Sequence, residues 1–147
     1  MKEELPAGEY TVPIGKAVVR RDGRDLTIIS YAAAAHTSLD AALLLAKEGI
    51  DAEVIDLRTL LPLDREAIVS SVKKTGKLLI VHEDTRTGGI AGEIAAIVCE
   101  DAFGHLDGPI ARVTALDTPV PYSPPLEEFF LPSVEKVAAA ARELAQY

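Results

Sequence analysis

The sequence predicts an α/β protein in which a largely parallel sheet carries helices on both faces. Two patterns support this prediction. Short runs rich in valine, isoleucine and leucine alternate along the chain with longer segments whose apolar residues recur at helical spacing. The clearest unit is the segment 77–103, KLLIVHEDTRTGGIAGEIAAIVCEDAF, where an uninterrupted apolar run precedes polar residues, a glycine loop and a helical pattern. Such a run is typical of a strand covered on both faces, so the unit is interpreted as strand, loop and helix.

The amino-terminal part of the chain is predicted to be a linker followed by two strands. Residues 2–14 are mostly polar and contain prolines, so residues 1–15 are expected to form a linker and residues 16–147 the domain. Lys16–Arg20 and Leu26–Ile29 are the first two expected strands. Asp22-Gly23 between them is a strong turn signal, so the residues alone predict a hairpin.

The next segments alternate between helix and strand. The first helix is expected to start at Thr37 or Ser38 as N-cap and to end near Gly49, with an inward stripe of Leu39, Leu43 and Ala46. Ala52–Ile55 is the third strand. Asp64 is the expected N-cap of the second helix, Gly76 its end, and Ile68, Val69 and Val72 its buried face.

The carboxyl-terminal part completes the alternation. Leu78–Val81 is the fourth expected strand, and Ile110–Val113 the fifth. Residues 118–132 contain five prolines and are expected to be irregular. Ser133 is the expected cap of the last helix, whose buried stripe is Val134, Val137, Ala138, Ala141 and Leu144.

Composition excludes several classes of function. A chain of 147 residues with 48% hydrophobic residues is expected to be one domain with a real core. The net charge of -8 argues against binding to nucleic acid or anionic membranes. The acidic start predicts neither a signal nor a transit peptide. The single cysteine, Cys99, fits a reducing compartment, so a bacterial cytoplasmic location is expected.

The glycine loop is the first candidate site. Gly88 and Gly89 open a helix, and helix amino ends attract anions, which makes this loop a candidate anion site. The loop matches neither the dinucleotide fingerprint nor the P-loop, so the alternative is that the glycines only permit a tight entry into the helix.

Other reactive residues do not form a recognisable catalytic set. His82 and Glu83 end a strand and are candidate acid and base, but neighbouring strand residues point to opposite faces. One is therefore expected to be buried and hydrogen-bonded, and the other to line an interface. The histidines show no metal-ligand spacing, and Cys99 is expected to be an inert, buried thiol. Residue chemistry alone does not indicate a complete enzyme.

Several stretches together resemble one known family. The chain is similar to the carboxyl-terminal, transketolase-C-type domain of the beta chain of thiamine-diphosphate-dependent 2-oxo acid dehydrogenases, which act on pyruvate or branched-chain 2-oxo acids. The resemblance covers nearly the whole chain. It rests on Tyr10–Ala17, Gly49–Leu60, Pro62-Leu63-Asp64, His82-Glu83, Thr87-Gly88-Gly89, Glu93-Ile94, Arg112-Val113, Asp117-Thr118-Pro119, Pro121-Tyr122 and Leu131–Val134.

The resemblance implies a fold that differs from the hairpin. It implies a three-layer αβα sandwich with a mixed sheet of about five strands, ordered 1-3-2-4-5, in which strand 1 is antiparallel. Strand 1 would then lie beside strand 3 rather than strand 2. The loops at Tyr31–His36 and His82–Gly89 would border one crevice. Ala32 departs from the family, which usually has glycine after the tyrosine.

The resemblance also implies a function without catalysis in this domain. Thiamine diphosphate and magnesium would sit in other domains, and this domain would support a homodimer of beta chains and dock the subunit-binding domain of the lipoyl acyltransferase. Candidate interface or docking residues are Arg58, His82, Glu83, Leu106, Asp107 and Tyr147. Arg58, near Asp56, is expected to pair with a carboxylate at a domain seam. The alternatives are the corresponding domain of a transketolase or deoxyxylulose-phosphate synthase, or a free-standing anion- or small-molecule-binding module.

Overall fold

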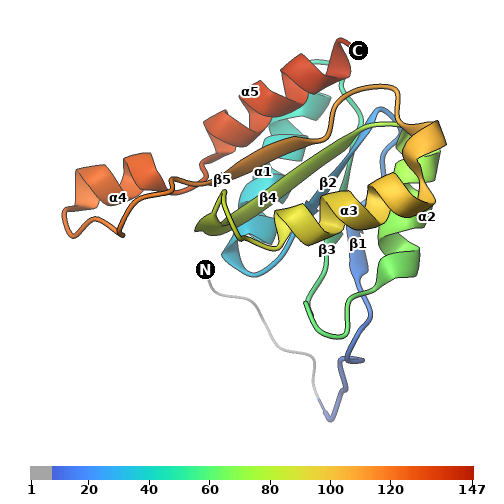
Figure 1. Ribbon diagram of the computed structural model, residues 1–147, viewed down its shortest axis with the longest axis horizontal. Helices are drawn as coiled ribbons and strands as arrows, with labels where there is room; N and C mark the ends of the chain where they lie inside the picture. The colour runs from blue at the N-terminus through green and yellow to red at the C-terminus, as the bar shows by residue number, and fades with distance from the viewer. Residues whose placement is uncertain (1–7) are drawn as a thin grey trace.

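Five strands form one mixed sheet in the computed structural model, which describes residues 8–147 (Figure 1). The order is β1-β3-β2-β4-β5; β1 runs antiparallel to β3, and the other neighbours are parallel. This confirms the α/β class and the order that the resemblance implied. The strands are β1 (Val18–Arg21), β2 (Leu26–Ser30), β3 (Ala52–Asp56), β4 (Leu78–Thr85) and β5 (Ala111–Ala115).

The hairpin predicted at Asp22-Gly23 is wrong, because β3 lies between β1 and β2. After β1 the chain turns beneath the start of β3. There the backbone N–H groups of Arg24 and Asp25 donate to the carbonyl oxygen of Asp51 at 2.8 and 3.0 Å. The turn is present, but the strands on either side of it do not pair with each other. The crossover through the first helix places β3 beside β2, and β3 then occupies the position between β2 and β1.

Four long helices complete the three layers (Figure 1). α1 (Ala33–Ala46) and α5 (Val134–Ala145) cover one face of the sheet, and α2 (Arg65–Thr75) and α3 (Ala91–Asp101) cover the other. Strand β2 shows how two cores arise from one strand. Ile28 belongs to the core under α1 and α5, whereas Ile29 belongs to the core under α2 and α3.

Three helix ends follow the predicted signals. The Asp64 carboxylate accepts a hydrogen bond from the backbone N–H of Ala67 at 3.2 Å, and Gly76 closes α2 in the left-handed conformation. Ser133 caps α5 through the N–H of Lys136 at 3.3 Å. The stripe predicted for α5 faces the core, with Val137, Ala138, Ala141 and Leu144 buried.

The prediction for α1 is wrong in its start and in its buried face. The helix begins at Ala33, and Ser38 lies inside it with a buried side chain. Leu43, expected to face inward, is 53% exposed. The buried face consists mainly of alanines, which let α1 approach the sheet and α5 closely, so leucine spacing did not mark it. The buried residues are Ala34, Ala35, Ser38, Ala41, Ala42 and Leu45. Gly49 is left-handed, as predicted.

Residues 118–132 are not wholly irregular, because they contain the short helix α4 (Pro124–Phe130). Its prolines occupy the first turn, where a missing N–H costs nothing. A 3-10 turn, η1 (Phe103–His105), follows α3. Figure 1 shows α4 projecting from the body beyond the carboxyl end of β5. Within residues 8–147, no helix has the length and hydrophobicity needed to cross a membrane.

Candidate functional site

Strand β4 positions the first group of candidate residues. It does not end at Val81 as predicted but continues to Thr85. Val81 pairs with Val113 and Thr85 with Ala115, so β4 bulges outward over His82, Glu83 and Asp84. This bulge lies at the carboxyl end of the sheet, where α/β proteins bind ligands.

His82 and Glu83 point in different directions, as predicted. Glu83 is exposed, whereas His82 is fully buried and stacks on the Tyr31 ring with 6.3 Å between ring centroids and 23° between planes. The expected hydrogen bond is wrong, because neither ring nitrogen of His82 has a partner among the described residues. Burial lowers the pKa of His82 and favours the neutral imidazole. The acid–base pair is therefore not assembled.

Gly89 lies directly against the His82 ring. A Cβ atom at Gly89 would be 2.6 Å from Cε1 and 3.2 Å from Nε2 of the imidazole, and would also clash with the carbonyl oxygen of Thr85. Glycine is thus required at this position for packing, which supports the structural interpretation of the loop. The Cε1–Nε2 edge of the ring faces Gly89.

The contact between Tyr31 and His82 confirms that the two expected loops meet, but two separate open hollows replace the single crevice. The first, about 640 Å³, lies at the start of α3 and is lined by Arg86, Thr87, Gly88, Gly89, Ile90, Gly92, Glu93 and Arg112. The second, about 810 Å³, lies at the start of α1 and is lined by Val12, Arg20, Ala32, Ala33, His36, Thr37, Asp40, Asp56 and Arg58. Sequence reasoning did not identify Arg86 and Arg112, because Arg86 follows β4 whereas Arg112 lies in β5, and only the pairing of these strands brings them together.

Arg58 does not pair with Asp56 within this chain, so its pairing with a carboxylate at a domain seam stays a prediction. Arg20 occupies Asp56 instead, with its Nε and Nη2 atoms 3.1 and 2.8 Å from Oδ2. The Arg58 side chain is exposed, and only its backbone N–H donates to Asp56, at 3.1 Å. β1 supplies the competing arginine because it lies antiparallel beside β3, with Val18 opposite Asp56.

A second group of candidates lies at the opposite, amino-terminal end of the sheet. Leu106 is half-buried and packs against the core under α2 and α3, so it offers little free apolar surface. Asp107 is exposed, and its backbone N–H donates to the carbonyl of Gly76 at 2.7 Å. Tyr147 is 65% exposed and rests against Gly108. The structure therefore brings Asp107 and Tyr147 to the same corner.

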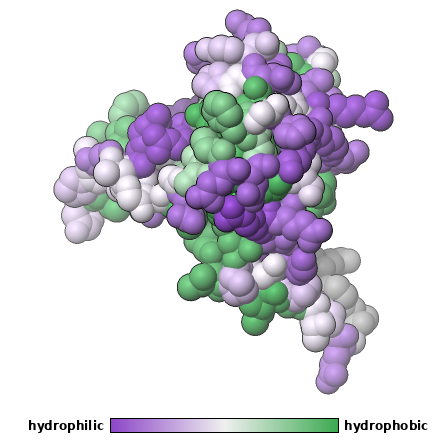
Figure 2. Space-filling model, turned by 45° about the vertical axis from the view of Figure 1, so that its right-hand side comes forward, coloured by the Kyte–Doolittle hydropathy of each residue, from purple (hydrophilic) through white to green (hydrophobic). Residues whose placement is uncertain are grey.

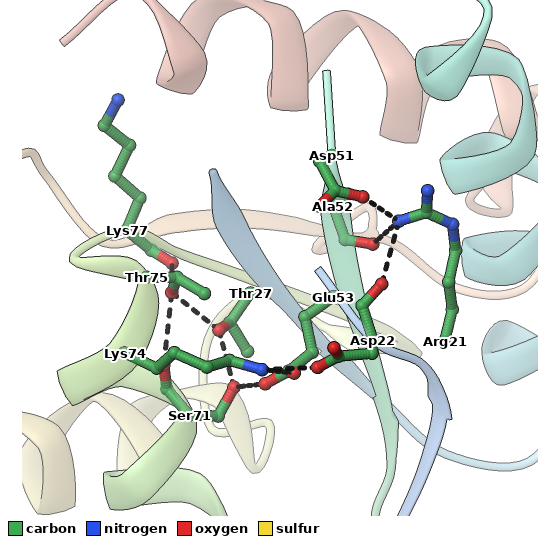
Figure 3. Close-up of polar contacts among 10 residues, drawn as sticks. All are labelled: Arg21, Asp22, Thr27, Asp51, Ala52, Glu53, Ser71, Lys74, Thr75 and Lys77. Atoms are coloured by element: carbon green, nitrogen blue, oxygen red, sulfur yellow. Dashed lines mark hydrogen bonds and ion pairs between the residues drawn. The ribbon is translucent and has the colours of Figure 1, made fainter. Parts of the chain in front are cut away.

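A buried polar network that the sequence did not indicate joins β2, β3 and α2 (Figure 3). The Glu53 side chain is 2% exposed and accepts hydrogen bonds from Ser71 and Lys74. Thr27 bonds to Ser71 and Thr75 at 2.6 and 2.7 Å. Although burial alone would lower it, the hydrogen bonds to Asp22 and Glu53 raise the pKa of Lys74. A lysine held in its charged form is a poor general base, so the network is structural.

Cys99 is exposed on α3, which corrects the expectation of a buried thiol. Among residues 8–147, no cluster of three or more histidine, cysteine, aspartate or glutamate side chains is suited to a metal ion.

Comparison with known proteins identifies the family. The sequence profile described as "Transketolase, C-terminal domain" matches residues 15–137. The chain belongs to this family. It is 49% identical over its full length to the 2-oxoisovalerate dehydrogenase subunit beta of Bacillus subtilis and 44% identical to the pyruvate dehydrogenase E1 component subunit beta of the same organism. It covers 45% of each of these relatives, so it spans less than half of their length.

Solved structures agree with this family. A split-gene transketolase, described as an inactive beta4 tetramer, matches 98% of this chain with a TM-score of 0.79 and 28% identity, over 46% of its own length. A transketolase from Pichia stipitis shares the fold, with a TM-score of 0.61 at 18% identity, over 89% of this chain and 18% of its own.

The backbone at Ala32 accounts for the glycine that the family resemblance implies after Tyr31. Ala32 occupies that position with φ 51° and ψ -136°, a region that favours glycine. Alanine there stores backbone strain, typically about 1–3 kcal/mol. The strain lies at the rim of the second hollow, beside Arg58, whose φ of 59° is also positive.

The neutral, buried His82 of this domain predicts a dependence of stability on pH. Because the pKa of His82 is lowered in the folded protein, the unfolded chain binds the proton first as the pH falls. The contribution of His82 to the free energy of unfolding is therefore fully present above about pH 6.5 and decreases below that value. His82→Gln should flatten this slope in denaturant titrations between pH 7.5 and 5.5. The matched control is His105→Gln, since His105 is exposed. Equal slopes in the parent and the His82 variant would show that His82 is not held neutral.

Proposed function

We propose that this chain is the carboxyl-terminal assembly domain of the beta chain of a 2-oxo acid dehydrogenase. The parent enzyme would use thiamine diphosphate to decarboxylate a 2-oxo acid oxidatively and would transfer the acyl group to lipoyl. The identity of 49% with a 2-oxoisovalerate dehydrogenase subunit beta, over the full length of this chain, is the observation that carries the proposal. The transketolase alternative is less well supported, since the matching split-gene transketolase is 28% identical.

The domain would serve assembly rather than catalysis. The described residues do not fit thiamine diphosphate with magnesium, because they offer no cluster of metal-binding side chains and His82 and Glu83 do not converge. We therefore place both groups in the part of the beta chain and its partners that this chain lacks. This chain matches 45% of the length of its dehydrogenase relative, which favours a domain that works within a larger enzyme over a free-standing module.

Exposed apolar side chains at the carboxyl end of the sheet support contacts with the rest of such an enzyme. They occur in the amino-terminal segment, in the loop after β3, and along α4 and the residues before it. Figure 2 shows apolar surface at the lower edge and on the projecting arm. The residues are Tyr10, Val12, Ile14, Leu61, Leu116, Val120, Tyr122, Leu126 and Phe129. Exposed apolar surface of this kind is typical of interaction sites.

We assign these contacts to the other domains and to the second beta chain of a homodimer. Residues 1–15 would be the linker to the preceding domain, and residues 16–147 the domain itself; of the linker, residues 1–7 lie outside the described residues. Arg58 and Glu83 are exposed at this end and would contribute to the interface, whereas buried His82 would shape it through its contacts with Tyr31 and Gly89. We propose a bacterial cytoplasmic location, for which the single cysteine is suitable.

The opposite end of the sheet would dock the subunit-binding domain of the lipoyl acyltransferase. Asp107 offers negative charge near the ring of Tyr147, and the half-buried Leu106 supports the Asp107 loop from the core side. A net charge of -8 would attract a basic partner at long range. An aromatic side chain flanked by charge is a common anchor in protein interfaces.

The docking proposal predicts salt-sensitive binding of an isolated, basic subunit-binding domain to this chain in surface plasmon resonance. Asp107→Lys and deletion of Tyr147 should each weaken binding by roughly tenfold or more, and raising the salt concentration should weaken binding to the parent chain. Asp84→Lys, an exposed aspartate at the other end of the sheet, is the matched control. Parent-like binding by both docking variants would place the partner elsewhere.

A further inference from the structure

The hollow at the start of α3 contains two arginines, Arg86 and Arg112, that form no ion pair within the described part of the chain. Arg86 Nη1 donates to the carbonyl oxygen of Arg112 at 3.3 Å, and Arg112 Nη1 donates to the carbonyl of Arg86 at 3.4 Å. Among residues 8–147, neither guanidinium forms an ion pair with an aspartate or glutamate. Crossed in this way, the side chains hold two positive charges at one edge of an acidic protein.

Two carboxylates lie near these charges and offset them in part without forming an ion pair with either guanidinium. Asp117 lies close to Arg86 and interacts with its positive charge, while its oxygens accept the backbone N–H and the hydroxyl of Thr87 at 2.9 and 2.7 Å. These hydrogen bonds lower the pKa of Asp117 and fix the glycine loop against the end of β5. Glu93, in the first turn of α3, is the negative side chain that lines the hollow itself.

The floor of the hollow adds further groups suited to an anion. Gly88, Gly89 and Gly92 line it without side chains, so a ligand can approach the backbone at the positive end of the eleven-residue helix α3. Behind Gly89 lies the fully buried imidazole of His82, with its Cε1–Nε2 edge toward that glycine and both nitrogens without a partner among the described residues. A buried imidazole without a hydrogen bond is unfavourable, and an anion above Gly89 would interact with it.

We propose that this hollow, formed by Arg86, Arg112 and the glycines at the start of α3, binds a small oxyanion, the phosphate or carboxylate group of a metabolite. Guanidinium groups bind both oxyanions through paired hydrogen bonds, and two of them favour the more highly charged phosphate. The hollow of about 640 Å³ accommodates a molecule of metabolite size. This site is separate from the docking corner at Asp107 and Tyr147, and it does not depend on the proposed function.

The test is a titration of the ¹⁵N-labelled chain with sodium phosphate at constant ionic strength, followed by NMR. The amide signals of Gly88, Gly89 and Gly92 should shift along saturable curves. The double variant Arg86→Ala/Arg112→Ala should weaken binding by roughly tenfold or more, whereas Arg142→Ala, which removes an arginine paired with Glu48 on the other face, should not change it.

Weaker binding by the double arginine variant could also result from a loss of structure, so a second variant is chosen that should bind more tightly. Glu93→Gln removes the negative side chain from the hollow and should tighten phosphate binding by roughly two- to fivefold. A parallel titration with sodium acetate distinguishes the two kinds of oxyanion, because the ion that binds more tightly shows whether the hollow prefers phosphate or carboxylate groups. Shifts that do not saturate, that sodium chloride reproduces, or that persist in the double arginine variant would mean an adventitious ion only and would overturn the proposal.

Discussion

Replacing Lys74 by methionine is expected to lower the free energy of unfolding by about 3 kcal/mol. Lys74 is the cation that compensates the buried carboxylate of Glu53, which is 2% exposed beneath α2 (Figure 3). Methionine keeps the length of the side chain but leaves Glu53 with the hydroxyl of Ser71 alone. An uncompensated charge in a low-dielectric interior costs more than a surface ion pair contributes. The measurement is urea denaturation at neutral pH.

The double variant Glu53→Gln/Lys74→Met separates charge from packing. Because it removes the buried charge together with its partner, it should recover a large part of the lost stability. Lys73→Met is the matched control, since Lys73 is the exposed neighbour on the same helix and its replacement should change stability by about 0.5 kcal/mol or less. If Lys74→Met and Lys73→Met are equally stable, Glu53 does not depend on Lys74.

Gly23→Ala is expected to be about as damaging, with a loss of about 3 kcal/mol. A Cβ atom at this position would lie closer than 3.0 Å to three backbone atoms of Asp51, Ala52 and Glu53. These atoms begin β3, which is held on both sides by β1 and β2 and cannot yield. The result would show that close packing against the start of β3 requires glycine at position 23, rather than the hairpin turn that the sequence alone predicts.

Gly104→Ala is the control for this prediction. Gly104 is exposed in η1, and no heavy atom lies within 4 Å of a Cβ built there. Its replacement should change stability by about 0.5 kcal/mol or less in the same thermal and urea denaturation experiments. A Gly23→Ala variant as stable as Gly104→Ala would contradict the packing of the first turn against β3.

Local signals predicted those parts of the fold that local interactions determine. Asp64, Gly76 and Ser133 act at the helix ends where they were expected, because a cap depends on a few neighbouring backbone groups. Local signals could not predict the position of β1 in the sheet. The Asp22-Gly23 turn is compatible with a hairpin or a crossover, and only the resemblance to the family indicated that β1 pairs with β3.

The candidate site was predicted less well because it depends on side chains from distant segments. Arg58 and Asp56 are close in sequence, but the pleat and the antiparallel β1 bring Arg20 to Asp56 instead. The sequence did not predict that Glu53 is buried, because its partners Ser71 and Lys74 lie on α2, a different element. Similarly, Arg86 and Arg112 meet only because β4 and β5 are neighbours.

Transplantation into a relative tests most directly whether this chain is the assembly domain of a 2-oxo acid dehydrogenase. In the beta subunit of the Bacillus subtilis 2-oxoisovalerate dehydrogenase, the segment that this chain matches at 49% identity would be replaced by the chain itself. Reduction of 2,6-dichlorophenolindophenol with 2-oxoisovalerate, measured on the complex assembled with its partner subunits, should stay within roughly tenfold of the parent's rate, a loss below about 1.4 kcal/mol. The corresponding segment of the split-gene transketolase, at 28% identity to this chain, should give no active complex. A chimera that folds cooperatively but neither assembles nor reduces the dye would contradict the proposed function.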